Sequence, residues 1–214
     1  MKLVWTMLGA VAIIVLGGCA PGFEPPPGEV EATEFMGTEL TPIRDQSNNA
    51  IKGTQHLDRD SYRLVVDGEV DNVLSLSYAD LSAYPSQSRL LRFDCVEGWG
   101  FTAKWTGPRL LAILEDAGIR PGVSTVIFHS ADDYSTALEM EHVREKDTII
   151  ALRLNDITMP ADRGFPFQVV AESKYGYKWA KWVTRIELSS VDYKGYWEQR
   201  GYSNNADVGG PAFE

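Results

Sequence analysis

The feature that most constrains the fold of this chain is the shortness of its apolar segments, each of which ends at turn residues. Residues 62–66 (YRLVV) are rich in aromatic and β-branched side chains and run into Asp67-Gly68, a pair typical of tight turns. Further strand candidates of this kind are residues 89–95, 126–128, 148–154, 167–171 and 182–188. The pattern predicts a strand-rich domain.

Two short helices are expected between these strands. The first covers residues 78–83 and stops before Pro85. The second begins near Thr106-Gly107-Pro108, where the threonine can cap a helix and the proline suits its first turn. Leucines at helical spacing follow, and Gly118 ends the segment. The expected fold class is therefore α+β, with strand-rich mixed sheets and short helices.

The composition narrows the class of partner. The chain is 44% hydrophobic and 23% charged, which excludes a collagen, a coiled coil or a wholly disordered protein. Thirty acidic residues against twenty basic ones give a formal net charge of −10. Because such a field repels phosphate backbones, we expect no nucleic acid as a partner.

The N-terminus has the pattern of a secretory signal. An apolar run over residues 3–18 follows Lys2 and is shorter than the roughly 20 residues that span a bilayer. It ends in Leu16-Gly17-Gly18-Cys19, which resembles a bacterial lipobox with Cys19 as the lipidated residue. The alternatives are a plain signal peptide or an uncleaved anchor.

These patterns divide the chain into three parts. We expect a signal peptide over residues 1–18, a lipidated tether over 19–41 and one folded domain over 42–214. Prolines and glutamates in the tether favour an extended, solvated chain. The protein would then be an extracytoplasmic, membrane-anchored lipoprotein, in the periplasm or at the cell surface.

Cys95 would be the one free thiol of the mature protein, because the chain has two cysteines and Cys19 would carry the lipid. It ends a strand candidate and precedes glycines, which let a backbone approach a ligand closely. A thiolate is a strong nucleophile and a soft metal ligand. Asp94 and Glu97 disfavour a free thiolate, and a bound metal would reverse this effect. The alternative is a buried cysteine that acts as a small hydrophobe.

A second dense segment, residues 174–182 (KYGYKWAKW), places three lysines, a glycine and four aromatic residues together. Basic groups beside a glycine turn can hold a phosphate, and aromatic rings can flank a flat ring. The alternative is a strand hairpin with its lysines in solvent. The three histidines show no metal-binding spacing, and His142 is expected to be solvated.

Three stretches together carry a resemblance to a known family: residues 94–118 (DCVEGWGFTAKWTGPRLLAILEDAG), 150–166 (IALRLNDITMPADRGFP) and 174–188 (KYGYKWAKWVTRIEL). In order and spacing they resemble the molybdopterin-binding domain of the sulfite oxidase superfamily, from about residue 41 to residue 205. Residues 195–202 (GYWEQRGY) also fit this pattern. The resemblance implies that superfamily's fold and a Mo-molybdopterin cofactor.

The resemblance also implies roles for individual residues. The Cys95 thiolate would ligate molybdenum, as the metal-binding and catalytic residue. The other cofactor-binding residues implied are Asn48, Ser130, Arg163, Gln168, Tyr177, Lys178, Trp179 and Lys181. Among these, Lys178, Lys181 and the backbone around Trp179 would hold the cofactor's phosphate. Arg163 and Gln168 replace a His or Asn and an Arg of the family pattern, which disfavours an oxyanion such as sulfite.

The function implied is a molybdopterin-dependent oxidoreductase that performs oxygen-atom or electron transfer on a small substrate. The layout resembles the monomeric periplasmic methionine-sulfoxide reductase branch, because no fused haem domain or dimerisation domain is expected. A separate haem or cytochrome partner would then exchange the electrons, and the protein would be a monomer. Two alternatives remain open: a non-catalytic ligand-binding lipoprotein on this fold, and metal-free thiol redox chemistry at Cys95.

Overall fold

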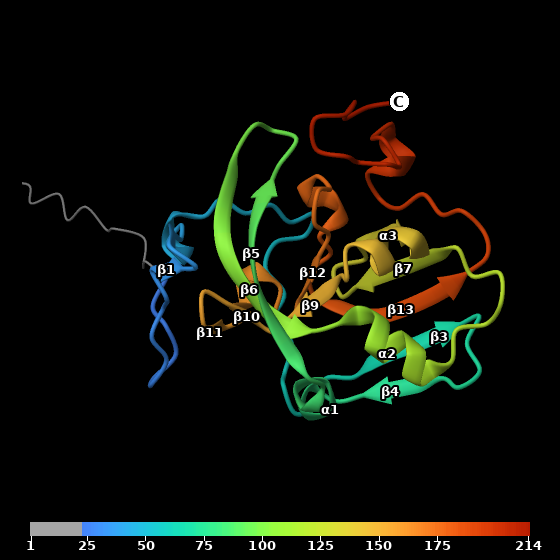
Figure 1. Cartoon of the computed structure of the whole chain (residues 1–214), viewed down its shortest axis with the longest axis horizontal. Helices are drawn as coiled ribbons and strands as arrows, with labels where there is room; N and C mark the ends of the chain where they lie inside the picture. The colour runs from blue at the N-terminus through green and yellow to red at the C-terminus, as the bar shows by residue number, and fades with distance from the viewer. Residues whose placement is uncertain (1–22) are drawn as a thin grey trace, which may run out of the picture.

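The computed structural model describes residues 23–214 of the chain (Figure 1). The expected signal peptide over residues 1–18 and the lipidation site at Cys19 lie outside the described residues. Within residues 23–214, no helix combines the length and the apolar character needed to cross a membrane.

The described elements are mostly strands, with short helices between them. The strands are β1 (Glu34–Phe35), β2 (Thr38–Glu39), β3 (Leu64–Gly68), β4 (Leu74–Leu76), β5 (Ser86–Asp94), β6 (Gly100–Pro108), β7 (Thr125–Ser130), β8 (Ser135–Glu139), β9 (Ile149–Ala151), β10 (Arg153–Leu154), β11 (Ile157–Thr158), β12 (Gln168–Val170) and β13 (Val183–Ser189). The helices are α1 (Tyr78–Ala83), α2 (Leu110–Ala117) and α3 (Met140–Glu145), with single 3-10 turns at Ile43–Asp45, Ala161–Arg163, Gly176–Lys178 and Glu198–Arg200.

Two larger sheets organise the molecule. One has the strand order β4-β3-β13-β7-β8, in which β13 runs parallel to β3 and antiparallel to β7. The other has the order β11-β10-β6-β5 and is antiparallel. The buried pair β9-β12 lies between them in the view of Figure 1. The strand-rich mixed architecture is the fold class that the sequence predicts.

The β5-β6 hairpin is the element that carries Cys95. Its strands pair from Ser86↔Pro108 to Asp94↔Gly100, and Cys95 is the first residue of the turn between them. Alternate residues of β6 are buried, including Phe101 and Trp105, as expected for a strand with one face on the core. The hairpin therefore holds the thiol at one end of a long, packed ribbon.

The start of the second helix differs from the prediction. Residues 106–108 continue β6, and α2 begins only at Leu110. Gly107 explains the difference, since a Cβ there would lie 1.9 Å from the backbone oxygen of Ile150. The glycine thus serves close packing against β9 rather than helix capping. The predicted end at Gly118 is confirmed, with a positive φ of 74°.

Helix α1 covers residues 78–83, as predicted, and begins with a capping box between Ser77 and Asp80. Helix α3 has no counterpart among the predicted helices. It carries His142, which was expected to be solvated but is half-buried, and burial beside lysines lowers the pKa of its imidazole to about 4.

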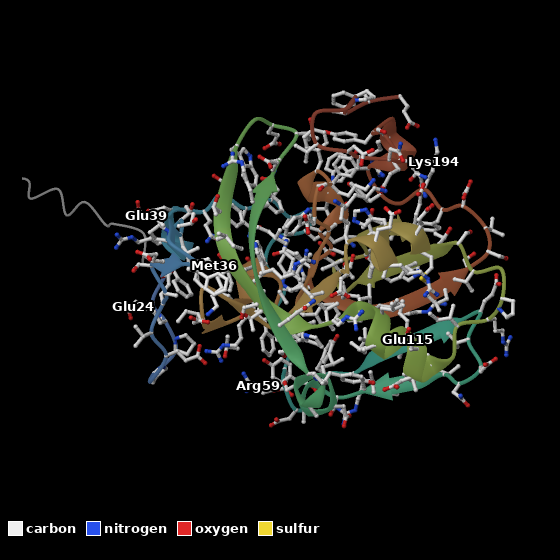
Figure 2. All side chains as sticks on the ribbon, in the orientation of Figure 1. Glu24, Met36, Glu39, Arg59, Glu115 and Lys194 are labelled. Carbon is white, nitrogen blue, oxygen red and sulfur yellow. The ribbon has the colours of Figure 1, made fainter. Side chains whose placement is uncertain are left out.

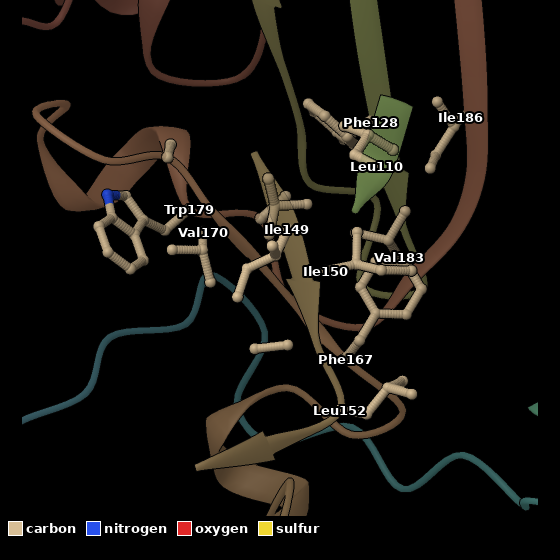
Figure 3. Packing of buried hydrophobic residues seen from close by; sticks show 14 of the residues in the cluster. Leu110, Phe128, Ile149, Ile150, Leu152, Phe167, Val170, Trp179, Val183 and Ile186 are labelled. Carbon is tan, nitrogen blue, oxygen red and sulfur yellow. The ribbon is translucent and has the colours of Figure 1, made fainter. Parts of the chain in front are cut away.

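The core joins residues from both sheets. Trp105 and Phe128 are fully buried, as is Phe167. Figure 3 shows Phe128 and Phe167 among the buried side chains of Ile149, Ile150 and their neighbours. A core of this size fixes the strands rigidly, so the loops at their ends can be held in defined positions.

The segment expected to be a solvated tether is packed from about Glu29 onward. Glu29 accepts hydrogen bonds from the backbone N–H (2.5 Å) and hydroxyl (2.6 Å) of Thr158, and Glu31 accepts one from the N–H of Ile43 at 2.7 Å. The β1-β2 hairpin follows, with Met36 exposed at its turn (Figure 2). Acidic residues that suggested a free spacer therefore dock this segment on the domain.

Candidate functional site

A cavity of about 420 Å³ brings together most of the residues singled out in the sequence. The predicted residues that line it are Asn48, Cys95, Arg163, Gln168, Tyr177, Trp179 and Lys181. They come from segments far apart in the chain, so their meeting is a consequence of the fold. Ser130 and Lys178 are not among the residues that line the cavity.

Cys95 lies at the cavity with its backbone held in a tight turn. Its N–H donates to the carbonyl of Trp99 at 2.8 Å, and its carbonyl accepts from the N–H of Gly98 at 3.1 Å. The thiol is half-buried, and burial, with a smaller contribution from the charge of Glu97, raises its pKa. Without a bound cation, the sulfur is therefore a thiol rather than a reactive thiolate.

Gly176 explains how the lysine-rich segment reaches the cysteine strand. A Cβ at this position would lie 2.3 Å from Cζ of Phe93, two residues before Cys95. Only a residue without a side chain lets the 3-10 turn Gly176–Lys178 rest directly on that ring. Trp179, at the end of the turn, then meets Phe93 edge-on at a ring-centroid distance of 5.2 Å.

A polar network joins three walls of the cavity. Lys181 donates through Nζ to Oδ1 of Asn48 and to the carbonyl of Asn49. Nδ2 of Asn49 donates to Oε2 of Glu97 at 3.0 Å, and Nε1 of Trp99 donates to the same oxygen at 2.9 Å. The Asn48-Asn49 segment is thus tied to the lysine-rich segment on one side and to the turn after Cys95 on the other.

Arg163 is buried and anchors the chain that leads into Asn48. Its guanidinium donates to the carbonyls of Ile43, Gln46 and Ser47 at 2.7–3.0 Å. These contacts use the two terminal nitrogens, so the guanidinium group holds the backbone of this segment in position. Burial lowers its pKa without leaving it neutral, since arginine stays protonated in proteins.

The other predicted residues have more local partners. Gln168 is buried and donates to the carbonyl of Trp179 at 3.3 Å. Ser130 ends β7, and its hydroxyl makes no hydrogen bond. Lys178, expected at a phosphate, instead forms a buried ion pair with Glu198 at 2.7 Å, because its side chain points toward β8.

Sequence reasoning missed several residues that line the cavity. Asp132 follows β7, and burial raises the pKa of its carboxyl group. The aromatic lining residues for which no role was predicted are Phe93, Trp99, Phe101, Tyr134, Trp182, Tyr196, Trp197 and Tyr202. The last three belong to residues 195–202 (GYWEQRGY), which fit the family pattern and are dense in aromatics, a signal that could have indicated them.

The residues present fit an anionic cofactor that brings its own metal chelate. No cluster of three or more His, Cys, Asp or Glu side chains suited to a metal occurs in the described part of the chain. A metal at Cys95 would therefore need ligands from a cofactor. Lys181 supports an anionic group, since burial and the neighbouring charge of Arg163 lower its pKa to about 8. An anion beside Lys181 and Arg163 would offset the cost of burying these two positive charges close together.

A half-buried thiol, a half-buried lysine and a large cavity point to one class: an oxidoreductase domain that binds a metal–pterin cofactor. Residues 51–197 match the family model described as the oxidoreductase molybdopterin binding domain. This protein belongs to that family, and it is a molybdenum-dependent oxidoreductase with a Mo-molybdopterin cofactor. The family predicted from the three sequence stretches is confirmed.

Curated relatives agree with this assignment, and a solved structure shares the fold. The chain is 31% identical over 184 residues to YedZ1 of Azospira oryzae, named provisionally as a protein-methionine-sulfoxide reductase subunit, covering 81% of this chain and 70% of that protein. It is 25% identical to the methionine-sulfoxide reductase catalytic subunit MsrP of Campylobacter jejuni, covering 70% and 56%. The sulfane dehydrogenase SoxCD of Paracoccus pantotrophus shares the fold, with a TM-score of 0.62 at 22% identity over 65% of this chain and 41% of that one.

Proposed function

We propose that this protein is a lipid-anchored, extracytoplasmic molybdenum enzyme that reduces a small, uncharged oxygen-atom donor such as a sulfoxide. The observation that carries the proposal is the single cavity lined by Cys95, Asn48 and Lys181. The cofactor would supply the metal at which the oxygen atom and the electrons are exchanged. Cys95 would bind that metal through its thiolate sulfur.

The remaining polar residues of the cavity would hold the cofactor. Lys181 would bind its phosphate, together with Gln168 and the backbone around Trp179. Asn48 would contact the pterin, held by Arg163 through the preceding carbonyls. Ser130, predicted near the cofactor, would act only through its neighbours, since it does not line the cavity.

The charges at the cavity favour an uncharged substrate. Its charged lining residues, among those the structure describes, are Glu97, Asp132, Arg163 and Lys181. Arg163 binds backbone carbonyls and Lys181 would hold the cofactor's phosphate, so neither cation would be left to hold an anionic substrate. An anion such as sulfite would meet two carboxylates, which disfavours it.

The reduction needs electrons from outside the chain. In sulfoxide reduction the S–O bond breaks, sulfur accepts two electrons, and the oxygen leaves as water with two protons. A separate haem protein would be the electron donor. Residues 23–214 contain no C-x-x-C-H motif for attaching a haem, and Cys95 has no second cysteine among them with which to form a redox-active pair. The lipid on Cys19 would keep the enzyme at the membrane that carries this partner.

Metal analysis of protein purified from its native membrane tests the proposal. Wild-type protein should contain close to one molybdenum atom per chain, and Cys95→Ser should lower the content strongly. Ser88→Ala is the matched control, because Ser88 lies on β5, the strand that leads to Cys95. This variant should keep its metal. Wild-type protein that lacks molybdenum but still binds a ligand would favour the non-catalytic alternative.

A further inference from the structure

The cavity has an aromatic wall, which we define as Tyr134, Tyr196, Trp197 and Tyr202. All four are half-buried and line the cavity. Their rings form one continuous cluster, with centroid distances of 5.9 Å for Tyr134–Tyr196, 5.1 Å for Tyr196–Trp197 and 5.0 Å for Trp197–Tyr202. No charged side chain belongs to it, so the wall offers an apolar, polarisable surface.

Three of these four residues come from the C-terminal part of the chain. In Figure 1 this part lies beside the turn that precedes β13 and above α3. The family match ends at residue 197, so Tyr202 and the residues that hold it follow the shared domain. Tyr134, Tyr196 and Trp197 lie within the family match, Trp197 at its last residue, so the wall joins the shared domain to the residues that follow it.

A buried ion pair fixes this wall to the domain. Lys178 and Glu198 have side chains that are 2% and 0% exposed, with Nζ and Oε1 2.7 Å apart. Lys178 also donates to the carbonyl of Ala137 at 3.1 Å, and Glu198 accepts from the hydroxyl of Thr136 at 2.6 Å. Glu198 directly follows Trp197, so the pair ties the wall to strand β8.

Further contacts complete the attachment. The backbone N–H of Tyr196 donates to the carbonyl of Ser135 at 2.8 Å, and the hydroxyl of Tyr177 donates to the carbonyl of Ser203 at 2.8 Å. A Cβ at Gly195 would lie 2.1 Å from the same Ser135 oxygen, so the chain passes very close to β8 there. The wall is thus attached at both ends, with the ion pair between them.

We propose that the aromatic wall determines substrate specificity by binding the apolar or aryl group of an uncharged oxygen-atom donor, and that Lys178 and Glu198 are its positioning residues. This inference rests on the proposed function of the same cavity. The donors of Lys178 are occupied by Glu198, Ala137 and Asn204, which agrees with a positioning role rather than phosphate binding.

Turnover of two sulfoxides that differ only in the group facing the wall tests the proposal. The full-length holoenzyme is assayed with methyl phenyl sulfoxide and with dimethyl sulfoxide, with reduced methyl viologen as the electron donor. Tyr202→Ala should raise KM for the phenyl substrate about tenfold and leave KM for dimethyl sulfoxide within about twofold, because an apolar contact contributes to binding. An equal change for both substrates would overturn the specificity role.

The ratio of the KM values for the two sulfoxides also tests the ion pair between Lys178 and Glu198. Glu198→Ala should lose most of the preference for the phenyl substrate, and Glu198→Gln, which keeps an oxygen acceptor, should restore much of it. Lys194→Ala is the matched control, since Lys194 forms an exposed pair with Glu214 in the same segment. Loss of kcat with an unchanged KM ratio in Glu198→Ala would contradict positioning of the wall.

A binding measurement separates this inference from the proposed function. Methyl phenyl sulfone and dimethyl sulfone already carry a second oxygen on sulfur. Their binding to full-length protein is compared by saturation-transfer NMR, whether or not that protein reduces sulfoxides. Selective binding of the phenyl sulfone, lost in Tyr202→Ala, supports the wall even if no sulfoxide is reduced. Absence of selective binding in wild-type protein would overturn the proposed role of the aromatic wall, whatever the metal content of the protein.

Discussion

Lys181 has a pKa of about 8, below its ordinary value of 10.5, because its ammonium group is buried and lies near Arg163. A phosphate needs that ammonium protonated. We therefore expect inorganic phosphate to bind cofactor-free protein more weakly as pH rises through about 8, and calorimetry at a series of pH values measures this. Lys181→Arg should keep the affinity at high pH. The same pH dependence in Lys181→Met would contradict the role of this lysine.

The same pKa has a consequence for stability with the opposite sign. Because the folded-state pKa lies below the unfolded one, the protonated folded form carries a penalty at pH values below about 8. The penalty fades as pH rises from about 8 toward 10.5. Cofactor-free wild-type protein should therefore gain free energy of unfolding over this window relative to Lys181→Met, which denaturant titration can detect.

Residues named from the sequence were predicted best where one local pattern carried several chemical signals. Cys95 before glycines, and Lys181 in a run of lysines and aromatics, both line the cavity. Lys178 belongs to that same run, yet its side chain points to β8 and pairs there with Glu198. The spacing of residues along the chain cannot show this pairing. Asp132 and Tyr134 gave no local signal, since only the fold brings their turn to the cavity.

Among the elements, the 3-10 turn at Ala161–Arg163 has a positioning role that extends beyond its own contacts. Its Arg163 holds three carbonyls of the segment that carries Asn48. Arg163→Ala would remove the charged donor from three carbonyls, of which that of Ile43 keeps the N–H of Gln46, and hydrogen bonds from charged groups contribute about 1.5–3 kcal/mol each. We expect the free energy of unfolding to fall by about 3 kcal/mol, measured in urea.

A second effect of Arg163→Ala separates positioning from bulk stability. The Asn48-Asn49 segment should exchange its amide hydrogens faster, and the hydrogen bonds of Lys181 to this segment should weaken. Arg153→Ala, at an exposed arginine on β10, is the control and should leave this segment protected. Unchanged exchange at Asn48 and Asn49 in Arg163→Ala would contradict the positioning role.

Element prediction succeeded where a boundary had a local chemical cause. Helix α1 has its capping serine and a proline two residues after its end, and its bounds were predicted correctly. Strand β6 was missed although Phe101, Ala103 and Trp105 alternate with polar residues, because Gly107 was assigned to the start of a helix. Gly107 serves close packing against Ile150, which is distant in sequence, so no local rule could identify its role.

At the scale of the whole molecule, two sheets and the C-terminal part of the chain meet around one cavity. The acidic segment before the domain is docked through Glu29 and Glu31, so only a short stretch of chain would separate the domain from a lipid on Cys19. Such a short connection would hold the cavity near the membrane that carries the electron donor.

Lipid anchoring is tested at this scale by Cys19→Ala. The wild-type protein should partition into the detergent phase of Triton X-114 and incorporate labelled palmitate. The variant should do neither, because in this proposal the acyl-modified Cys19 would supply the anchor. Equal partitioning of the two proteins would show that another feature holds this protein at the membrane.

The bond between the Cys95 sulfur and molybdenum is tested most directly by X-ray absorption at the molybdenum edge, normalised to each molybdenum atom so that partial loading suffices. The measurement compares wild-type protein with Cys95→Ser, both purified from native membranes. We predict that the number of sulfur atoms bound to molybdenum falls by one in the variant. An unchanged sulfur number would contradict the assignment of Cys95 as the protein ligand of the metal.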